Sequence, residues 1–454
     1  MVFSSLYFLY LFLPAVLLLL LLTPKPGRNY VLLLVNLIFY AYGEPVYVLL
    51  MLASIAVNYT LALLLDRCQR RRKLLLWLAV VLNLGALGVF KYAGLFTATL
   101  HRLIPAIPVL SLALPIGISF YTFQALSYVV DVYRRDCAAE RNFAGFASYI
   151  SLFPQLIAGP IVRYADVKEQ LTNPLKGADR MAWGVRMFVI GLAKKVLLAN
   201  QLGLLWTAVS PAPAAAGTLG AWLALAAFAL QIYFDFSGYS DMARGLGAML
   251  GFDFCVNFNY PYLSKSITEF WRRWHISLSS WFRDYVYFPL GGSRCGTARL
   301  CFNLLVTWLL TGFWHGAGWN FLFWGLYYGV ILMLEKLVWG KGLEKLPAAL
   351  RRLYTIFLVL IGWVFFASET FTAAWQYLRV LFTPCAGTIP GGLLSWLPLG
   401  LTACFAATPL GATLWGRLKD RHGAVEAAAV LAAMVLCTAC LVNASYNPFL
   451  YFRF

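Results

Sequence analysis

Apolar runs long enough to cross a lipid bilayer recur along nearly the whole chain. Leu6–Leu22 is one of them, and a helix of roughly 17–25 apolar residues spans the hydrocarbon layer. Hydrocarbon offers the backbone no hydrogen-bond partner, so each run must pair its own N–H and C=O groups as a helix. Only 12% of the 454 residues are charged, where a soluble domain carries about a quarter. The pattern predicts an all-α integral membrane protein with roughly 10–12 transmembrane helices.

The basic residues that give the chain a net charge of +18 lie in short loops between apolar runs. Lys25 and Arg28 follow the first run, and five more basic residues lie within Arg67–Lys73. Cytoplasmic loops carry such an excess of Lys and Arg. We therefore expect these two loops in the cytoplasm, the N-terminus and the turn near Gly43–Pro45 outside, and no nucleic-acid partner.

The chain divides by composition into three segments of one membrane-embedded domain. Residues 1–130 are predicted as N-terminal helices, 131–350 as a polar-containing core and 351–454 as C-terminal helices. Within the core, Phe146–Val162 is short and interrupted by prolines and glycine, so a re-entrant or surface-lying segment is expected. The apolar stretch Cys301–Leu337 fits either one long tilted helix or a hairpin.

A polar block with two histidines stands out at residues 231–320. Ser266 and Glu269 form an S-x-x-E capping box, which predicts that a helix begins there. If that helix continues through His275 to Phe288, its tryptophans form one stripe, as in helices that lie in the membrane interface. Three arginines on its other faces are candidates for binding the phosphate groups of a ligand: Arg272, Arg273 and Arg283. By itself, His275 fits a hydrogen-bonded interfacial histidine as well as a catalytic one.

The second histidine, His315, lies in a stretch without charged residues between Arg299 and Glu335. An ionisable residue at membrane depth is energetically costly and usually marks a reactive site or a pathway. Desolvation keeps an imidazole neutral, so His315 is the candidate general base. Gly312 and Gly316 permit the close approach of a backbone or a ligand. Helix packing alone would explain the glycines but not the histidine.

Further residues are weaker candidates for support of the two histidines. Ser279 follows His275 by one helical turn and is a candidate nucleophile, although such serines more often bond a backbone carbonyl. Asp241 is expected to pair with Arg244, three residues later. The remaining candidates are Asp235, as a carboxylate that orients His315, together with Trp314 and Asn320. Two histidines forty residues apart, without a Cys/His cluster, do not predict a metal site.

Five stretches of the chain resemble the membrane-bound O-acyltransferase (MBOAT) family, closest to its alginate O-acetyltransferase branch. The stretches are Leu114–Arg134, Leu152–Arg163, Tyr233–Phe252, Phe270–Arg294 and Thr311–Gly325. The resemblance covers essentially the whole chain, and both histidine motifs are long and in the family's order.

The resemblance implies a fold and an activity beyond those that the residues alone predict. It implies a ring of tilted helices around a central funnel, with His315 as the main catalytic histidine and His275 as the second. It also implies a cytosolic acyl donor such as acetyl-CoA or an acyl-carrier protein, no tightly bound cofactor, and an extracytoplasmic SGNH-type partner. A sibling branch carries D-alanine to teichoic acids, and Pro289–Arg294 favours the alginate-like branch.

Three hypotheses of function follow. The first is an O-acyltransferase in a bacterial cytoplasmic membrane that acylates, most often acetylates, a cell-envelope or exported polysaccharide, with D-alanyl transfer as its variant. The second is a transporter or channel, because these also use ionisable residues at membrane depth. The polar residues lie in one off-centre block rather than in two matching halves, which argues against transport. The third, an inactive scaffold, leaves His315 unexplained.

Overall fold

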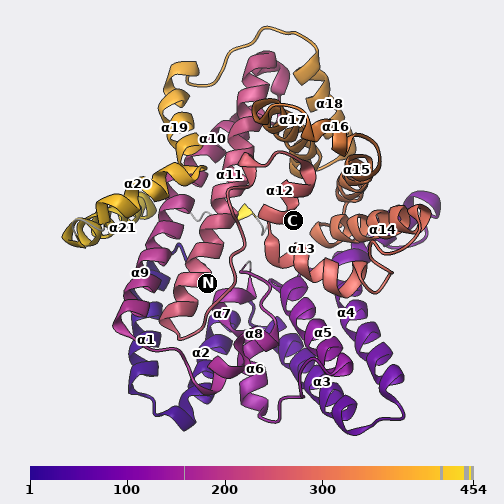
Figure 1. Ribbon diagram of the computed structural model, residues 1–454, viewed down its shortest axis with the longest axis vertical. Helices are drawn as coiled ribbons and strands as arrows, with labels where there is room; N and C mark the ends of the chain where they lie inside the picture. Colours follow the sequence, from indigo (N-terminus) through magenta and orange to yellow (C-terminus); the bar gives the residue numbers. More distant parts are fainter. Residues whose placement is uncertain (158, 420–422, 444–448, 451–454) are drawn as a thin grey trace. The chain divides into compact units, whose positions relative to one another are not determined.

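The computed structural model describes residues 1–157, 159–419, 423–443 and 449–450, and every regular element among them is helical (Figure 1). The all-α class is therefore confirmed. The described residues form two compact units, Met1–Phe188 with Ser240–Cys255, and Val189–Tyr239 with Val256–Phe454. The two helices α9 (Ala178–Ala193) and α11 (Pro213–Met249) pass from one unit into the other. The expectation of a single domain in three segments stays a prediction.

The first unit contains most of the N-terminal helices. They are α1 (Leu13–Leu22), α2 (Arg28–Gly43), α3 (Tyr47–Arg67), α4 (Arg72–Leu103), α5 (Ile118–Arg134), α6 (Phe143–Ser151), α7 (Phe153–Leu156) and α8 (Tyr164–Thr172). α3, α4 and α5 pack side by side, and nearly every residue of α5 is buried (Figure 1). The predicted interruption of Phe146–Val162 is confirmed, since α6 ends before Leu152 and α7 is a single turn. Both helices are buried inside this unit, and the position of the segment relative to the membrane stays a prediction.

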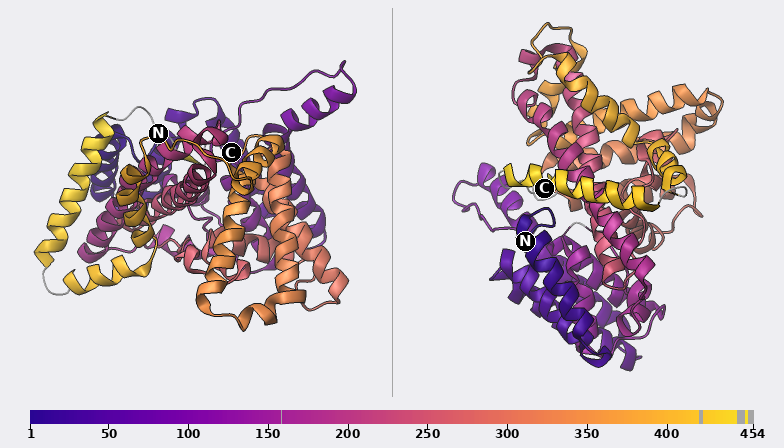
Figure 2. Two further views of the ribbon diagram at one scale, coloured as in Figure 1. Left: turned by 90° about the horizontal axis from the view of Figure 1, so that it is seen from above. Right: turned by 90° about the vertical axis from the view of Figure 1, so that its left-hand side faces the viewer.

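The second unit contains the two histidine motifs and the C-terminal helices. Its α-helices after α11 are α12 (Ile267–Arg273), α13 (Ile276–Phe282), α14 (Thr297–His315), α15 (Trp319–Leu334), α16 (Gly340–Glu344), α17 (Ala348–Ala367), α18 (Phe371–Phe382), α19 (Leu393–Ala406), α20 (Pro409–Lys419) and α21 (Gly423–Asn443). α10 (Asn200–Val209) precedes α11. α15 and α17, joined through the short α16, pack against each other (orange in Figure 2).

The stretch Cys301–Leu337 is a helical hairpin rather than one long helix. α14 ends at His315, three residues connect it to α15, and the two helices pack along their length. A Cβ atom on Gly312 would clash with the carbonyl oxygen of Phe321, and one on Gly325 with the carbonyl oxygen of Trp308. The absence of side chains at both positions therefore lets the two backbones approach closely.

Seven helical segments among the described residues are long and apolar enough to cross a membrane, or eight if the bent α19–α20 pair is one span. Shorter apolar helices such as Phe8–Leu22 account for other runs that the sequence suggested as spans. The helix α21, yellow in Figure 2, carries mostly exposed apolar side chains, as expected for a helix that faces lipid. The helices around His275, α12 and α13, are too short to be spans.

Candidate active site

His275 lies at a break between two short helices, so the predicted continuous helix from Ser266 to Phe288 is wrong. α12 ends at Arg273 and α13 begins at Ile276. Between them, His275 has φ 44° and ψ 54°, the left-handed conformation that L-residues avoid. This conformation stops the helical hydrogen-bond ladder and turns the chain between α12 and α13.

Asn257, on the segment before α12, holds this break in place. Its side-chain oxygen Oδ1 accepts hydrogen bonds from the Ser277 amide (3.1 Å) and hydroxyl (2.9 Å) and lies 3.2 Å from His275 Nδ1. Its backbone carbonyl accepts from the amide of Ile276 at 3.0 Å. A backbone N–H can only donate, so the Asn257 atom that faces Ser277 must be the oxygen. His275 Nδ1 therefore faces an acceptor and carries the hydrogen.

This tautomer leaves Nε2 of His275 with a free lone pair. Nε2 has no hydrogen-bond partner among the residues that the structure describes, and the side chain is 1% exposed. Burial lowers the pKa of His275, which lies outside the spanning segments, to about 3. The imidazole is therefore neutral at physiological pH, and Nε2 is a buried hydrogen-bond acceptor for a bound group.

The aromatic residues around His275 form a core rather than an interfacial stripe. Trp271, Trp274 and Trp281, expected on the surface of an amphipathic helix, are all buried. Trp271 packs against Trp308 and Trp324 with ring centroids 4.7 and 5.5 Å apart. The hydrophobic side chains thus face other helices of the second unit, which an analysis of one helix in isolation does not reveal.

His315 is the last residue of α14 and is enclosed by aromatic rings. Its ring centroid lies 4.9 Å from that of Trp314, 5.1 Å from that of Trp324 and 5.3 Å from that of Phe366. The Trp314 ring also lies 6.1 Å from the ring of His275. One buried indole therefore neighbours both histidines, and this brings the two motifs into one site.

Some buried polar atoms near His315 have no hydrogen-bond partner among the described residues. They are Nε1 of Trp271, Nε1 of Trp324 and the hydroxyl of Tyr328, and the three rings pack against one another. A buried polar group without a partner is costly unless water or a ligand pairs with it. The aromatic site therefore offers hydrogen-bond donors to a polar molecule.

Asn320 and Glu335 position the elements that carry the histidines. The side-chain amide of Asn320 donates to the carbonyl oxygens of Phe365 (3.3 Å) and Ser368 (2.8 Å), which ties the start of α15 to the end of α17. The buried carboxylate of Glu335 accepts from the amides of Ile267 (2.7 Å) and Thr268 (2.9 Å). These bonds satisfy amides at the start of α12 that have no partner within the helix.

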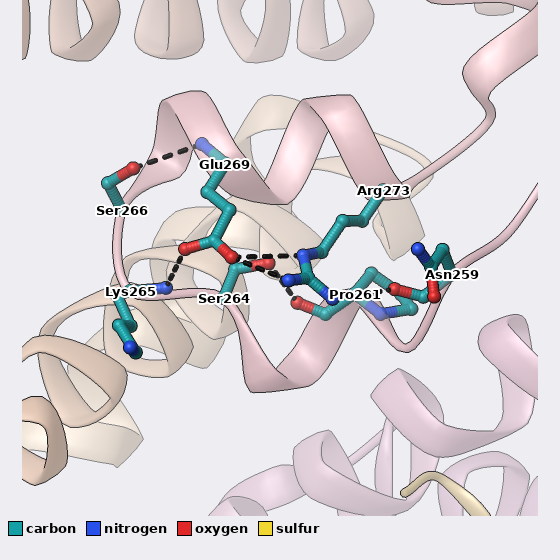
Figure 3. A network of polar contacts seen from close by, with 7 residues as sticks. All are labelled: Asn259, Pro261, Ser264, Lys265, Ser266, Glu269 and Arg273. Atoms are coloured by element: carbon teal, nitrogen blue, oxygen red, sulfur yellow. Dashed lines mark hydrogen bonds and ion pairs between the residues drawn. The ribbon is translucent and has the colours of Figure 1, made fainter. Parts of the chain in front are cut away.

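The predicted capping box is present at the start of α12, except that the side chain of Glu269 bonds the amide of Lys265 instead of that of Ser266. Ser266 accepts from the amide of Glu269 at 3.0 Å, while the carboxylate of Glu269 accepts from the amide of Lys265 at 2.8 Å (Figure 3). Partial burial raises the pKa of Glu269, but the bonds from Lys265 and Arg273 outweigh it and lower the pKa below its usual value. The guanidinium of Arg273, which also pairs with Glu269, donates to the carbonyl of Asn259 at 3.2 Å (Figure 3).

The three candidate donor-binding arginines differ in their partners. Arg273 pairs with Glu269 at 2.8 Å, and Arg283 pairs with Asp284 at 2.7 Å. Arg272 is exposed and has no ion-pair or hydrogen-bond partner among the described residues. Since a paired guanidinium has less capacity to hold a phosphate, Arg272 is the strongest of the three candidates.

The supporting carboxylates and Ser279 have other described contacts. Asp235 is buried against Lys195, and its second oxygen accepts from the amide of Leu450 at 2.8 Å. Asp241 lies 4.0 Å from Arg244, as the spacing predicted, and both belong to the first unit. Ser279 donates its amide to the carbonyl of His275, with no side-chain bond to that residue among the described contacts. A catalytic role of any of the three stays a prediction.

Comparison with known proteins decides the family. The model of the membrane-bound O-acyltransferase family matches residues 134–373, which include both histidine motifs. A probable alginate O-acetylase of Azotobacter vinelandii is 43% identical over 396 residues, covering 84% of this chain and 78% of that protein. The chain belongs to the membrane-bound O-acyltransferase family. It is therefore a membrane acyltransferase, and the transporter and scaffold hypotheses are not supported.

Two further relatives differ in the group that they transfer or in the acceptor. A peptidoglycan O-acetyltransferase of Helicobacter pylori is 34% identical over 382 residues, covering 77% of this chain and 72% of that protein. A teichoic acid D-alanyltransferase of Bacillus subtilis is 29% identical over 277 residues, covering 56% of this chain and 69% of that protein. Membership of the family thus agrees with the enzyme class expected from the histidine motifs.

Residues of this site that the sequence analysis missed act through tertiary contacts. Asn257 lies 18 residues before His275, and Phe366 lies far beyond the histidine motifs. Glu335 offered one signal, as a carboxylate inside an otherwise apolar run. Such a carboxylate must have partners to be stable at that depth, although the sequence does not say which.

Proposed function

We propose that this chain transfers an acetyl group from a cytosolic donor for the O-acetylation of a cell-envelope or exported polysaccharide. The observation that carries the proposal is that two buried histidines both neighbour the ring of Trp314, in a chain of this family. Relatives named for alginate and peptidoglycan O-acetylation support a polysaccharide acceptor. D-alanyl transfer is the alternative reaction. It ranks second because the teichoic acid D-alanyltransferase is less similar to this chain than the O-acetylating relatives.

In this proposal, His315 is the general base. Its imidazole takes the proton of an attacking hydroxyl group, the hydroxyl oxygen forms a bond to the acyl carbon, and the thioester's sulfur leaves and receives a proton. The indole N–H of Trp324, whose ring packs against His315, is a candidate donor to the oxygen on which negative charge develops. A buried aromatic site also limits the access of water, which would otherwise hydrolyse the donor. Nε2 of His275 is a hydrogen-bond acceptor that can orient the bound substrate.

The acyl donor in this proposal is acetyl-CoA or an acyl-carrier protein, and no cofactor stays bound. Both donors carry phosphate groups, for which Arg272 is the candidate partner because its guanidinium has no described carboxylate partner. An SGNH-type transferase outside the membrane is the proposed partner that completes delivery to the polymer. We place the enzyme in the bacterial cytoplasmic membrane with its N-terminus outside, following the distribution of basic loops.

The experiment compares O-acetyl content of envelope polysaccharide in cells that express wild type, His315→Ala or His275→Asn at matched membrane levels. His101→Ala is the control, because His101 is exposed in the last turn of α4 in the first unit and contacts the carbonyl of Ile107. A general base contributes about 10²–10⁴-fold to a rate, so His315→Ala should reduce acetylation at least tenfold while the control is unchanged.

Two results would contradict the proposal. Unchanged acetylation in His315→Ala would exclude this histidine as the base for that polymer. Loss of D-alanyl esters with unchanged acetyl content would favour the alternative reaction. Retained thermal stability of the purified His315→Ala protein separates a chemical defect from a folding defect.

A further inference from the structure

A cleft of about 750 Å³ in the first unit is lined by basic side chains and contains no acidic one. It lies where the turn between α3 and α4 meets the C-terminal end of α5, and we call it the basic cleft. Its basic residues are Arg70, Arg71, Arg72, Lys73, Arg134 and Arg135. The cleft belongs to a different unit from the histidines, and the proposed acyl transfer makes no use of it.

Two of the arginines build the walls of the basic cleft. The guanidinium of Arg72 donates to the carbonyl oxygens of Val132 (3.0 Å) and Tyr133 (2.5 Å) at the end of α5. Arg135, which has the left-handed φ of 69°, donates to the side-chain oxygen of Gln69 at 2.6 Å. These bonds tie the α3–α4 turn to α5 from both sides, so the cleft has defined walls.

Three further basic residues of the cleft have no described counter-charge. Arg70, Arg71 and Lys73 are exposed and have no ion-pair or hydrogen-bond partner among the described residues. Like charges gathered in one cleft repel each other, and the lining supplies no carboxylate to offset them. The first amides of α4 also lack a side-chain cap, and their partial positive charge adds to the same field. An anion bound in the cleft would relieve this repulsion.

The position of the basic cleft indicates the source of that anion. α3 and α4 both meet the criterion for crossing a membrane, and only four residues, 68–71, separate them. A turn this short between two spans stays at the level of the lipid headgroups. Basic pockets between membrane helices are known to bind anionic headgroups, and the anionic lipids of the same membrane lie beside this turn. We propose that the basic cleft binds the phosphate headgroup of an anionic phospholipid.

The test compares two triple variants that each remove three positive charges. The cleft variant carries Arg70→Gln, Arg71→Gln and Lys73→Gln, which together remove the three basic side chains of the basic cleft that have no described partner. The matched control carries Lys341→Gln, Lys345→Gln and Arg352→Gln, three exposed residues in or next to α16 and near the start of α17. Each protein is placed in nanodiscs of phosphatidylethanolamine with a minor fraction of phosphatidylglycerol, released into the gas phase, and its retained lipids are counted by native mass spectrometry.

Wild type and control should retain phosphatidylglycerol in preference to phosphatidylethanolamine. A basic residue near an anionic surface contributes about fivefold in affinity. The preference of the cleft variant for phosphatidylglycerol over phosphatidylethanolamine should therefore be at least tenfold smaller than that of wild type. Equal losses in both triple variants would overturn the proposal, because they would reflect net charge alone. Displacement of phosphatidylglycerol by millimolar inorganic phosphate would also overturn it, in favour of a soluble phosphate ligand. Equal thermal midpoints of the three proteins in a neutral detergent exclude unfolding as the cause, and acetylation remains a separate readout.

Discussion

The imidazole of His275 is held where the backbone takes a conformation that costs an L-residue about 1–2 kcal/mol. Three hydrogen bonds to Asn257 from Ile276 and Ser277 offset this cost, since each contributes about 1 kcal/mol. A strained residue that the surrounding structure holds in place is a common feature of functional sites. At the residue scale, Asn257 therefore accounts for three features of the site. These are the break in the helix, the tautomer of His275 and the absence of a described partner for its Nε2.

The depressed pKa of His275 predicts an acid-dependent loss of stability. The neutral imidazole is favoured in the folded state, with a pKa of about 3, while the unfolded chain has the ordinary value of about 6.5. The unfolded state binds more protons between these values, so stability is fully present above pH 6.5 and falls as the pH drops towards 3. From pH 7 to pH 5 this histidine should cost about 2 kcal/mol of the free energy of unfolding.

Thermal unfolding of the detergent-solubilised protein at pH 7 and pH 5 measures this effect against His275→Asn. Asparagine tolerates the left-handed conformation and its amide can donate to Asn257, but it does not titrate. The variant should therefore lose less stability on acidification than wild type. If both proteins lose the same amount, His275 is not buried as the neutral form.

At the scale of elements, the hairpin of α14 and α15 sets the position of His315. Sequence periodicity left a long helix and a hairpin equally open for Cys301–Leu337. The hairpin forms because three residues with two glycines interrupt the helix after His315, and because Gly312 and Gly325 let the two helices pack closely. The sequence thus predicted both histidine motifs and the capping box of α12. The break at His275 could not be predicted, because it depends on Asn257, whose contact with α13 is made only in the folded unit.

Gly312→Ala should separate α14 from α15. The added Cβ would clash with the carbonyl oxygen of Phe321 and lie 3.1 Å from the Cα atom of Gly325, and both are backbone atoms that cannot turn away. Overpacking of this kind costs about 1–3 kcal/mol. We expect a lower thermal midpoint and lower acetylation, because His315 follows on the same helix.

Gly85→Ala is the matched control for this change. Gly85 also lies inside a helix, α4, but a Cβ atom there would meet nothing within 4 Å. Its replacement should be neutral or stabilising by about 0.4–1 kcal/mol. A Gly312→Ala protein as stable as the Gly85→Ala protein would show that the hairpin does not depend on close backbone packing.

At the scale of the whole molecule, contacts between residues far apart in the chain stabilise the second unit. Asp235 bonds Lys195 and the amide of Leu450, which lies 215 residues later. The apolar runs and the basic loops predict a multi-span membrane protein, because both follow from the bilayer itself. Long-range polar partners such as these leave no periodic signal, so Asp235 looked from the sequence like a partner of His315.

The side of the membrane on which each loop lies is testable with cysteines. α3 has 21 residues, so at 1.5 Å per residue it is about 31 Å long, close to the thickness of the hydrocarbon layer. Its two ends should therefore lie on opposite sides of the membrane. Cys68 is exposed and directly follows α3, next to the basic cleft. Val46 is 70% exposed and directly precedes α3. If the basic loop is cytoplasmic, Cys68 is inside and residue 46 is outside.

The experiment uses one variant that keeps Cys68 alone and one in which Val46→Cys is added to a chain without other cysteines. A membrane-impermeant maleimide should label Val46→Cys in intact cells, whereas Cys68 should react only after the membrane is permeabilised. The reverse result would place the N-terminus in the cytoplasm and would move the basic cleft to the outer surface. Labelling of both sites in intact cells would mean that α3 does not cross the membrane, because no intact bilayer would then separate its ends.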